Sequence, residues 1–353
     1  MPAPAALESH PPRCAPIWGM GFLLVLLSLI GLILYANPHG MFPWKFAKIS
    51  PTISTFVPTA ARTDKIALYN NLDFSPEVLI LGSSRALTIP SARILENTGY
   101  RTFNMSVNGG GPLDFLTFGR FTLSKDEPPT VLIVELVYPS LKVPENPMPV
   151  SMLPYLETDK GLETADKIFH DVVSLQSISD TVYQFTYGLL SKRPPNMTYI
   201  ADGTGIRVEL TEKQYRSELE RITKNVNQAS KCAALDALAM GQLESLIELA
   251  AQKQVAVLFY RSPLNADYLD MAESDHPDFI RCEALFNTYM SDLLASHPNV
   301  FFRDLTYYET VGALRWDGYY DVHHLKPLAA QLVVDALTPD IQKAMEWAID
   351  GNR

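Results

Sequence analysis

The sequence predicts an α/β protein built on a doubly wound, mostly parallel five-stranded sheet, with an N-terminal transmembrane helix and a mid-chain insertion. Short apolar runs alternate with segments of helical apolar spacing, which is typical of parallel strands that are buried on both faces. Near the N-terminus lies a much longer apolar run without any charge. The chain of 353 residues is 47% hydrophobic and 19% charged, so it can bury the large core that such a fold requires.

The N-terminal apolar run, IWGMGFLLVLLSLIGLILYA, spans residues 17–36 inside a stretch from 14 to 44 that contains no Asp, Glu, Lys or Arg. About 20 helical residues cross a hydrocarbon core of roughly 30 Å. The alternative is a cleaved signal peptide, but that would have a shorter apolar region and a small-x-small cleavage site, which YANPHG matches poorly. We therefore expect an N-terminal tail over 1–16, a transmembrane helix over 17–36 and a connector over 37–75.

The residues that flank this span give a weaker indication of orientation. Arg13 precedes it, whereas Lys45 and Lys48 follow it, so the positive-inside count slightly opposes a cytoplasmic N-terminus. Long domains cross a membrane largely regardless of such charges. We expect a single-pass protein of the inner or plasma membrane whose soluble domain lies outside the cytoplasm. There Cys232 and Cys282 would either form a disulfide or stay as buried thiols.

Beyond the connector, strands and helices alternate in a domain over 76–350. The regular pattern breaks at about 140–231, where mixed and mostly polar segments indicate an irregular or helical insertion. The first helix begins with Pro-Ser and ends at Gly99, which is typical of helix boundaries. We expect strands at 77–82, 100–107, 130–137, 255–260 and 299–305, and helices at 90–99, 111–124, 234–254, 278–297 and 327–348.

Composition and motifs argue against several classes of function. The net charge is −10 and the chain has no dense Lys/Arg stripe, so we expect no nucleic-acid partner. Only Gly82 of a G-x-G-x-x-G pattern follows the first strand, and the Gly-Lys-Ser/Thr ending of a P-loop is absent. His323 and His324 are adjacent, so their side chains diverge, and no H-E-x-x-H occurs. We expect neither a cofactor nor a metal.

The strongest candidate site combines two loops at one edge of the predicted sheet. The apolar strand VLIL runs into GSSR (82–85), and the late loop DGYYDVHHLKP contains Asp321 and His324, three residues apart. Both loops are expected at the carboxyl ends of strands, where ligands bind in such sheets. A serine nucleophile needs a base, and the base needs a carboxylate that fixes its tautomer. The other interpretation is a hydroxyl-rich turn and an ordinary surface pair of histidines.

These motifs resemble those of the SGNH (GDSL-type) hydrolase superfamily. The GSS run is similar to the Gly-Asp-Ser block of that family, with Ser83 in the place of the aspartate, which implies that Ser84 is the nucleophile. The second block of the family has an asparagine followed five residues later by an oxyanion glycine, and NMSVNG offers Asn104 and Gly109. The resemblance implies a flavodoxin-like, three-layer SGNH fold.

The last block of the family, Asp-x-x-His, matches Asp321 and His324, which implies an orienting carboxylate and a base. His323 and Asp317 are rivals with less favourable spacing. Together with the N-terminal anchor, the Gly-Ser-Ser opening and the late D-x-x-H-L also resemble the DltD-like, membrane-anchored branch. Members of that branch work beside membrane-bound O-acyltransferases on cell-envelope polymers.

One block of the family is missing. Gly-x-Asn-Asp should follow the third strand, but the chain reads ELVYPS there. Either the backbone amides of Ser84 and Gly109 suffice for an oxyanion, or Asn108 substitutes as a donor, or activity is weak. Glu135 ends the third strand as a hydrogen-bonded or solvated carboxylate, and Arg85 either binds an anionic substrate group or pairs with Glu135.

The sequence thus favours a membrane-anchored serine acyl hydrolase or acyltransferase with a Ser-His-Asp triad. The resemblance implies acyl esters, acetyl above all, of an extracytoplasmic envelope polysaccharide as substrates and a membrane-bound O-acyltransferase as partner. Two alternatives stay open. One is a catalytically inactive SGNH-like domain that binds glycan or docks onto such an acyltransferase, and the other is a lipase or general esterase.

Overall fold

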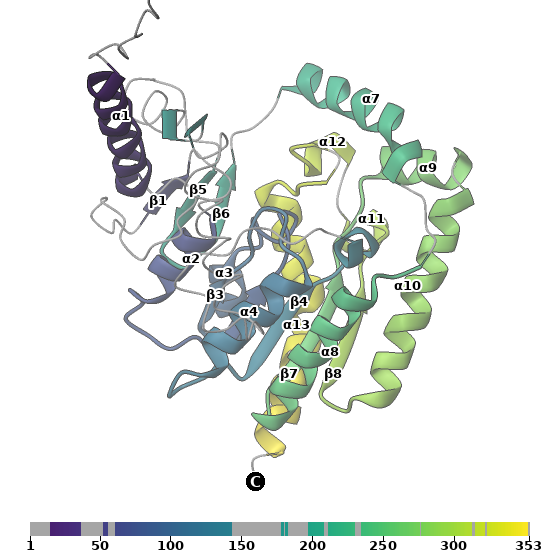
Figure 1. The fold of residues 1–353 in the computed structure, drawn as a ribbon. Helices are drawn as coiled ribbons and strands as arrows, with labels where there is room; N and C mark the ends of the chain where they lie inside the picture. Colours follow the sequence, from purple (N-terminus) through teal and green to yellow (C-terminus); the bar gives the residue numbers. More distant parts are fainter. Residues whose placement is uncertain are drawn as a thin grey trace, which may run out of the picture.

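The computed structural model shows a five-stranded parallel sheet with helices on both faces, as the sequence predicts (Figure 1). The strands are β2 (Val78–Leu81), β3 (Thr102–Asn104), β4 (Val131–Glu135), β7 (Ala256–Arg261) and β8 (Val300–Asp304), in the spatial order β3-β2-β4-β7-β8. The order reverses beside β2, so its carboxyl end is a topological switch point. The structure describes residues 15–36, 52–55, 61–142, 178–179, 181–182, 197–207, 211–229, 234–275, 277–312, 315–321 and 323–351.

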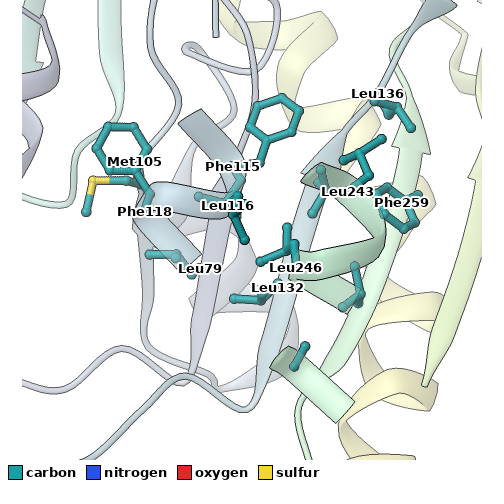
Figure 2. Close-up of a cluster of buried hydrophobic side chains, with 14 of the residues drawn as sticks. Leu79, Met105, Phe115, Leu116, Phe118, Leu132, Leu136, Leu243, Leu246 and Phe259 are labelled. Carbon is teal, nitrogen blue, oxygen red and sulfur yellow. The ribbon is translucent and has the colours of Figure 1, made fainter. Parts of the chain in front are cut away.

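One face of the sheet packs mainly against α4 (Pro112–Leu123), α8 (Ala237–Gln252) and α10 (Pro277–Ser296), and α2 (Ala61–Tyr69) contributes to the same apolar cluster. Leu79 and Phe259 belong to this cluster, which joins the strands to the helices. Figure 2 shows side chains of α4 and α8 meeting the strands in this cluster. Since the strands are covered here and on the other face, they can be apolar throughout.

The opposite face packs against α3 (Ser91–Thr98) and α13 (Pro327–Asp350). Ile80 and Leu258, each next to a residue of the first cluster in sequence, belong to this second cluster, as the two-residue period of a strand requires. Both clusters are fully buried along the strands, so the sheet is a rigid platform for the loops at its carboxyl edge.

A smaller antiparallel sheet is formed by β1 (Thr52–Thr55), β5 (Met197–Ile200) and β6 (Gly205–Arg207). Two of its strands come from the segment 140–231, which the sequence indicates as an irregular or helical insertion. The strands of the hairpin have only four and three residues, so their periodicity gives no strand signal. This sheet brings part of the insertion close to the main sheet, because Asn104 donates its backbone N–H to the carbonyl of Asp202 at 2.8 Å.

Helix α2 (Ala61–Tyr69) lies in the segment 37–75 that the sequence suggests is a connector, yet it is almost wholly buried. Lys65 is fully buried and donates from Nζ to the carbonyl of Asn104 at 2.6 Å and to that of Gly203. Burial lowers the pKa of Lys65 well below its usual range. Through these bonds α2 joins the insertion to the end of β3.

Five further elements lie within or between these segments. They are η2 (Tyr138–Lys142), α7 (Glu212–Ala229), α9 (Ala266–Asp275), α11 (Tyr308–Val311) and α12 (Arg315–Gly318).

Helix α1 (Ala15–Ala36) forms over the N-terminal apolar run. Ile33 is buried in a small cluster that includes Ile178. Within the described part of the chain, no helix is both long and apolar enough to cross a membrane. This finding contradicts the predicted single-pass membrane location, which we withdraw.

Candidate active site

The first loop of the site turns sharply at the carboxyl end of β2. Gly82 is buried, and a Cβ atom there would lie 2.5 Å from Cβ of Ala86 and 2.9 Å from Cβ of Glu135, so no larger residue fits. Ser83 is held by Glu135, because its backbone N–H and its hydroxyl donate to Oε2 at 3.0 and 2.7 Å. The turn leaves Ser84 partly exposed at the edge of the sheet.

The structure brings Ser84, His324 and Asp321 together. Oγ of Ser84 lies 2.8 Å from Nε2 of His324. Nδ1 of His324 lies 2.6 Å from Oδ2 and 2.8 Å from Oδ1 of Asp321. Oδ1 also accepts the backbone N–H groups of His323 and His324, at 2.8 and 3.0 Å. A proton on Nδ1 suits the carboxylate, so Nε2 is free to accept the proton of the serine hydroxyl.

Asp321 and His324 lie in the segment between β8 and α13. Backbone hydrogen bonds within that segment close the loop that carries them. An isolated bridge joins Tyr319 to Leu325, and the backbone N–H of Tyr320 donates to the carbonyl of His324 at 2.8 Å. Thr88, four residues after the nucleophile, donates its hydroxyl to the carbonyl of Leu325 at 3.1 Å. These bonds fix the imidazole relative to the serine.

Burial and neighbouring charges set the protonation of the site. Burial lowers the pKa of His324, and the charges of Arg207 and Arg85 lower it further, whereas the hydrogen bond that His324 donates to Asp321 raises it. Burial alone would raise the pKa of Asp321, but its bonds from His324 and His323 and the charge of Arg207 outweigh burial and hold that pKa well below its usual range. At neutral pH the imidazole is therefore neutral and the carboxylate is charged, which is the protonation that a general base and an orienting carboxylate would need.

Asn104 braces the nucleophile turn rather than facing the serine. Its side chain is fully buried and donates from Nδ2 to the carbonyls of Ala86 and Ile89, at 2.8 and 3.0 Å. Its Oδ1 accepts the backbone N–H of Ser106 at 3.0 Å. A single side chain thus connects the loop after β2 to the loop after β3.

The loop after β3 lies directly against the nucleophile turn. The backbone N–H of Val107 donates to the carbonyl of Gly82 at 3.1 Å, and a side chain at Gly110 would collide with that same carbonyl. Gly109 is exposed and has a positive φ of 62°. Within the described residues, the backbone N–H of Ser84 has no hydrogen-bond partner, so it can donate to an oxyanion.

Asn108 and Arg207 form a pair that the sequence does not reveal. Nη2 of Arg207, from the insertion strand β6, lies 3.4 Å from Oδ1 of Asn108, and Nη1 lies 3.7 Å from Oδ2 of Asp321. The guanidinium group of Arg207 thus contacts both the carboxylate of Asp321 and the loop that carries Asn108, which lies beside Ser84. Because the amide oxygen of Asn108 faces Arg207, its NH₂ group points elsewhere as a donor that no described residue uses.

The structure separates Arg85 from Glu135, which the sequence suggests as an ion pair. Instead Nη2 of Arg85 lies 3.3 Å from Nδ1 of His323, whose ring packs edge to face on Tyr268 at 5.5 Å between ring centroids. Because Nδ1 of His323 already contacts Arg85, His323 does not compete with His324 for the proton of the Ser84 hydroxyl. Asp317 is exposed and, among the described residues, hydrogen-bonds to neither histidine.

Two further features concern metals and cysteines. Among the described residues, no group of three or more His, Cys, Asp or Glu side chains could hold a metal ion. Cys282 is disulfide-bonded. Cys14 and Cys232 both lie outside the described residues, so the pairing with Cys232 stays a prediction.

Comparison with known proteins gives structural neighbours only. No protein-family model matches the chain, and no curated protein matches it. Its structural neighbours include a GDSL-like lipase from Bacteroides thetaiotaomicron VPI-5482 and a protein from Bacteroides fragilis NCTC 9343 described as an acylhydrolase. Each is 12% identical, with 80% of this chain and 95% of the neighbour covered and a TM-score of 0.38. These scores are too low to support an argument about function, and they do not single out the DltD-like branch.

Proposed function

We propose that this protein is a serine ester hydrolase of the SGNH type, in which Ser84 attacks an acyl ester. One observation carries the proposal. The hydroxyl of Ser84 lies 2.8 Å from Nε2 of His324, whose other ring nitrogen bonds to the partly buried carboxylate of Asp321. This is the hydrogen-bonded arrangement that makes a serine hydroxyl nucleophilic.

The proposed acylation step moves one proton and exchanges one bond. Nε2 of His324 takes the proton of Ser84 while Oγ forms a bond to the acyl carbon. The tetrahedral intermediate then collapses, the bond from the acyl carbon to the alcohol oxygen breaks, and the imidazolium returns the proton to that alcohol. Asp321 stabilises the imidazolium and stays ionised.

The negative charge of the intermediate needs donors at the carbonyl oxygen. The backbone N–H of Ser84 is one candidate, and the NH₂ group of Asn108, oriented by Arg207, is the other. In this proposal Asn108 takes the place of the asparagine that the third block lacks. Arg207 acts as a positioning residue because it contacts Asn108 and Asp321.

In the deacylation step, water replaces the alcohol and His324 removes its proton. The acid is released, and the proton returns to Ser84, which restores the free enzyme. A substrate hydroxyl in place of water would give acyl transfer instead. On the strength of the resemblance described above, we extend the proposal to O-acetyl esters of a polysaccharide, with simple esters as the alternative substrates.

The test is hydrolysis of 4-nitrophenyl acetate and labelling by a fluorophosphonate, which reacts with activated serines. We expect wild-type protein to do both, and Ser84→Ala and His324→Ala each to lose nearly all turnover. The double variant should lose little more, because triad members act as a unit. Ser291→Ala, at an exposed position on α10, is the matched control and should behave as wild type.

Three outcomes discriminate among the functions. A folded wild-type protein that is neither labelled nor active would favour an inactive, glycan-binding domain. Full activity in Ser84→Ala would show that the assigned nucleophile is wrong. Acetate release from an O-acetylated xylan, measured beside 4-nitrophenyl acetate, distinguishes a polysaccharide esterase from a general esterase.

A further inference from the structure

Arg85 directly follows Ser84, the proposed nucleophile. No described side chain neutralises the positive charge of its guanidinium group. Arg85 is partly exposed, and within the described residues no carboxylate lies within ion-pair distance of it. Its Nη2 contacts Nδ1 of His323, while its other guanidinium N–H groups have no hydrogen-bond partner in that part of the chain. An arginine has five such donors in a fixed plane, so most of the donors of Arg85 are available to a ligand.

His323 orients this guanidinium without cancelling its charge. Burial, with the charge of Arg85 adding to it, lowers the pKa of His323 to about 3, so the ring is neutral at neutral pH. A neutral ring can present Nδ1 as an acceptor to Arg85. The ring itself is held by its edge-to-face contact with Tyr268 and by its backbone bond to Asp321.

Other charged side chains of the site are already engaged, and Asp321 is bonded to His324 and lies beside Arg207. Glu135 is fully buried and accepts two hydrogen bonds from Ser83. Arg207 contacts Asp321 and Asn108. Arg85 is therefore, among the described residues, a charged group of this site that combines partial exposure with unused donors. In a chain of net charge −10, a partly exposed cation beside Ser84 is a local point of attraction for anionic groups.

We propose that Arg85 binds an oxyanion group of the substrate, so that the protein prefers acyl esters carrying a carboxylate, phosphate or sulfate near the ester bond. The proposal rests on the esterase function proposed above and names its substrate class. A planar guanidinium binds such groups through two parallel hydrogen bonds, which fixes their direction as well as their charge. His323 is the positioning residue for this contact.

The test compares matched charged and neutral esters. 4-Acetoxybenzoate and 4-acetoxybenzamide differ in charge on the alcohol side, whereas phenyl hydrogen adipate and phenyl hexanoate differ on the acyl side. Each kcat/KM is divided by the rate of the same ester with hydroxide, which removes intrinsic reactivity. We expect wild-type protein to prefer the charged member of at least one pair by about tenfold, the value of one charge-assisted hydrogen bond. The pair that shows the preference tells on which side of the ester the anion lies.

Variants then assign the preference to Arg85. Arg85→Gln should reduce the charged-to-neutral ratio to about one. His323→Ala should reduce it in the same direction, and His323→Asn should restore most of it because Oδ1 of asparagine can accept the same hydrogen bond. The double variant of Arg85→Gln and His323→Ala should fall no further than Arg85→Gln. Arg101→Gln, which removes an exposed arginine at the opposite end of β3, is the control and should keep the wild-type ratio.

Two results would overturn the proposal, and they are distinct from failure of the esterase function. Ser84-dependent hydrolysis with a ratio near one for both pairs would show that the site has no preference for anions. An anionic preference that survives in Arg85→Gln would assign it to another residue. If none of the four esters is hydrolysed by folded protein, the esterase function itself is wrong and this inference falls with it.

Discussion

Acidification from neutral pH to about pH 5 should destabilise the protein through His323. The ordinary pKa of histidine is 6.5, and burial, aided by the charges of Arg85 and His324, lowers the pKa of His323 to about 3. Between these values the unfolded chain binds a proton that the folded chain does not, so the free energy of unfolding falls as the pH falls. Each pH unit below 6.5 costs about 1.4 kcal/mol, which gives roughly 2 kcal/mol at pH 5.

The groups around His323 determine which comparison isolates this effect. The pKa of His324 is also lowered, so it adds to the loss in the same pH range. The lowered pKa of Asp321 acts only below the ordinary value of 3.8, because the stability that it contributes is lost as the pH falls through the folded pKa. His323→Asn removes the one titration and leaves the others.

The assay is urea denaturation of wild-type protein and His323→Asn at pH 7 and pH 5. We expect the variant to lose about 2 kcal/mol less than wild type on acidification, whatever its stability at pH 7. Equal losses in the two proteins would mean that His323 is protonated without cost in the folded state. That result would refute the argument that burial lowers the pKa of His323. It would also refute the neutral state of the His323 ring that we assign to its contact with Arg85.

Three other variants test the support of the site. Asn108→Ala should lower kcat for 4-nitrophenyl acetate by about 10²–10³ if its amide stabilises the oxyanion, and an unchanged kcat would exclude it. Arg207→Gln should lower kcat in wild type but much less in Asn108→Ala, and additive effects in the kinetic cycle would contradict a positioning role. Gly82→Ala should lower the free energy of unfolding by about 1–3 kcal/mol, as measured by urea denaturation, because the added Cβ meets Ala86 and Glu135; unchanged stability would mean that the turn can relax.

The sheet and the meeting of two distant loops could be predicted from the sequence because both follow from local pattern and topology. Buried parallel strands leave a continuous apolar signal, and their carboxyl ends share one edge. That edge is enough to bring Ser84 near Asp321 and His324. The spacing of Asp321 and His324 is likewise local, and the structure places both side chains in hydrogen-bond contact.

The support around these residues could not be predicted because it consists of polar side chains buried by contacts far along the chain. Arg62 pairs with Asp114 at 2.6 Å, with each side chain no more than 5% exposed, yet the sequence ARTDK reads as a solvated segment. Lys65 lies buried in the same helix and donates hydrogen bonds to backbone carbonyl groups, which leave no signature in the sequence. Arg207 comes from a hairpin that is too short to show the two-residue period of a strand. Arg85 contacts the neutral ring of His323, whereas the sequence alone suggests the carboxylate of Glu135 as its partner.

The hydrogen bond between Ser84 and His324 joins positions 240 residues apart. During synthesis the serine emerges early, while its base belongs to the last loop before the final helix. Under the proposed function, a ribosome-bound chain therefore carries an unactivated serine hydroxyl, and Ser84 becomes reactive only after α13 and the loop before it have packed onto the sheet. Labelling of Ser84 by an organophosphorus probe would thus report when the fold is complete. A truncated or partly folded chain lacks the placed imidazole that would activate the serine hydroxyl.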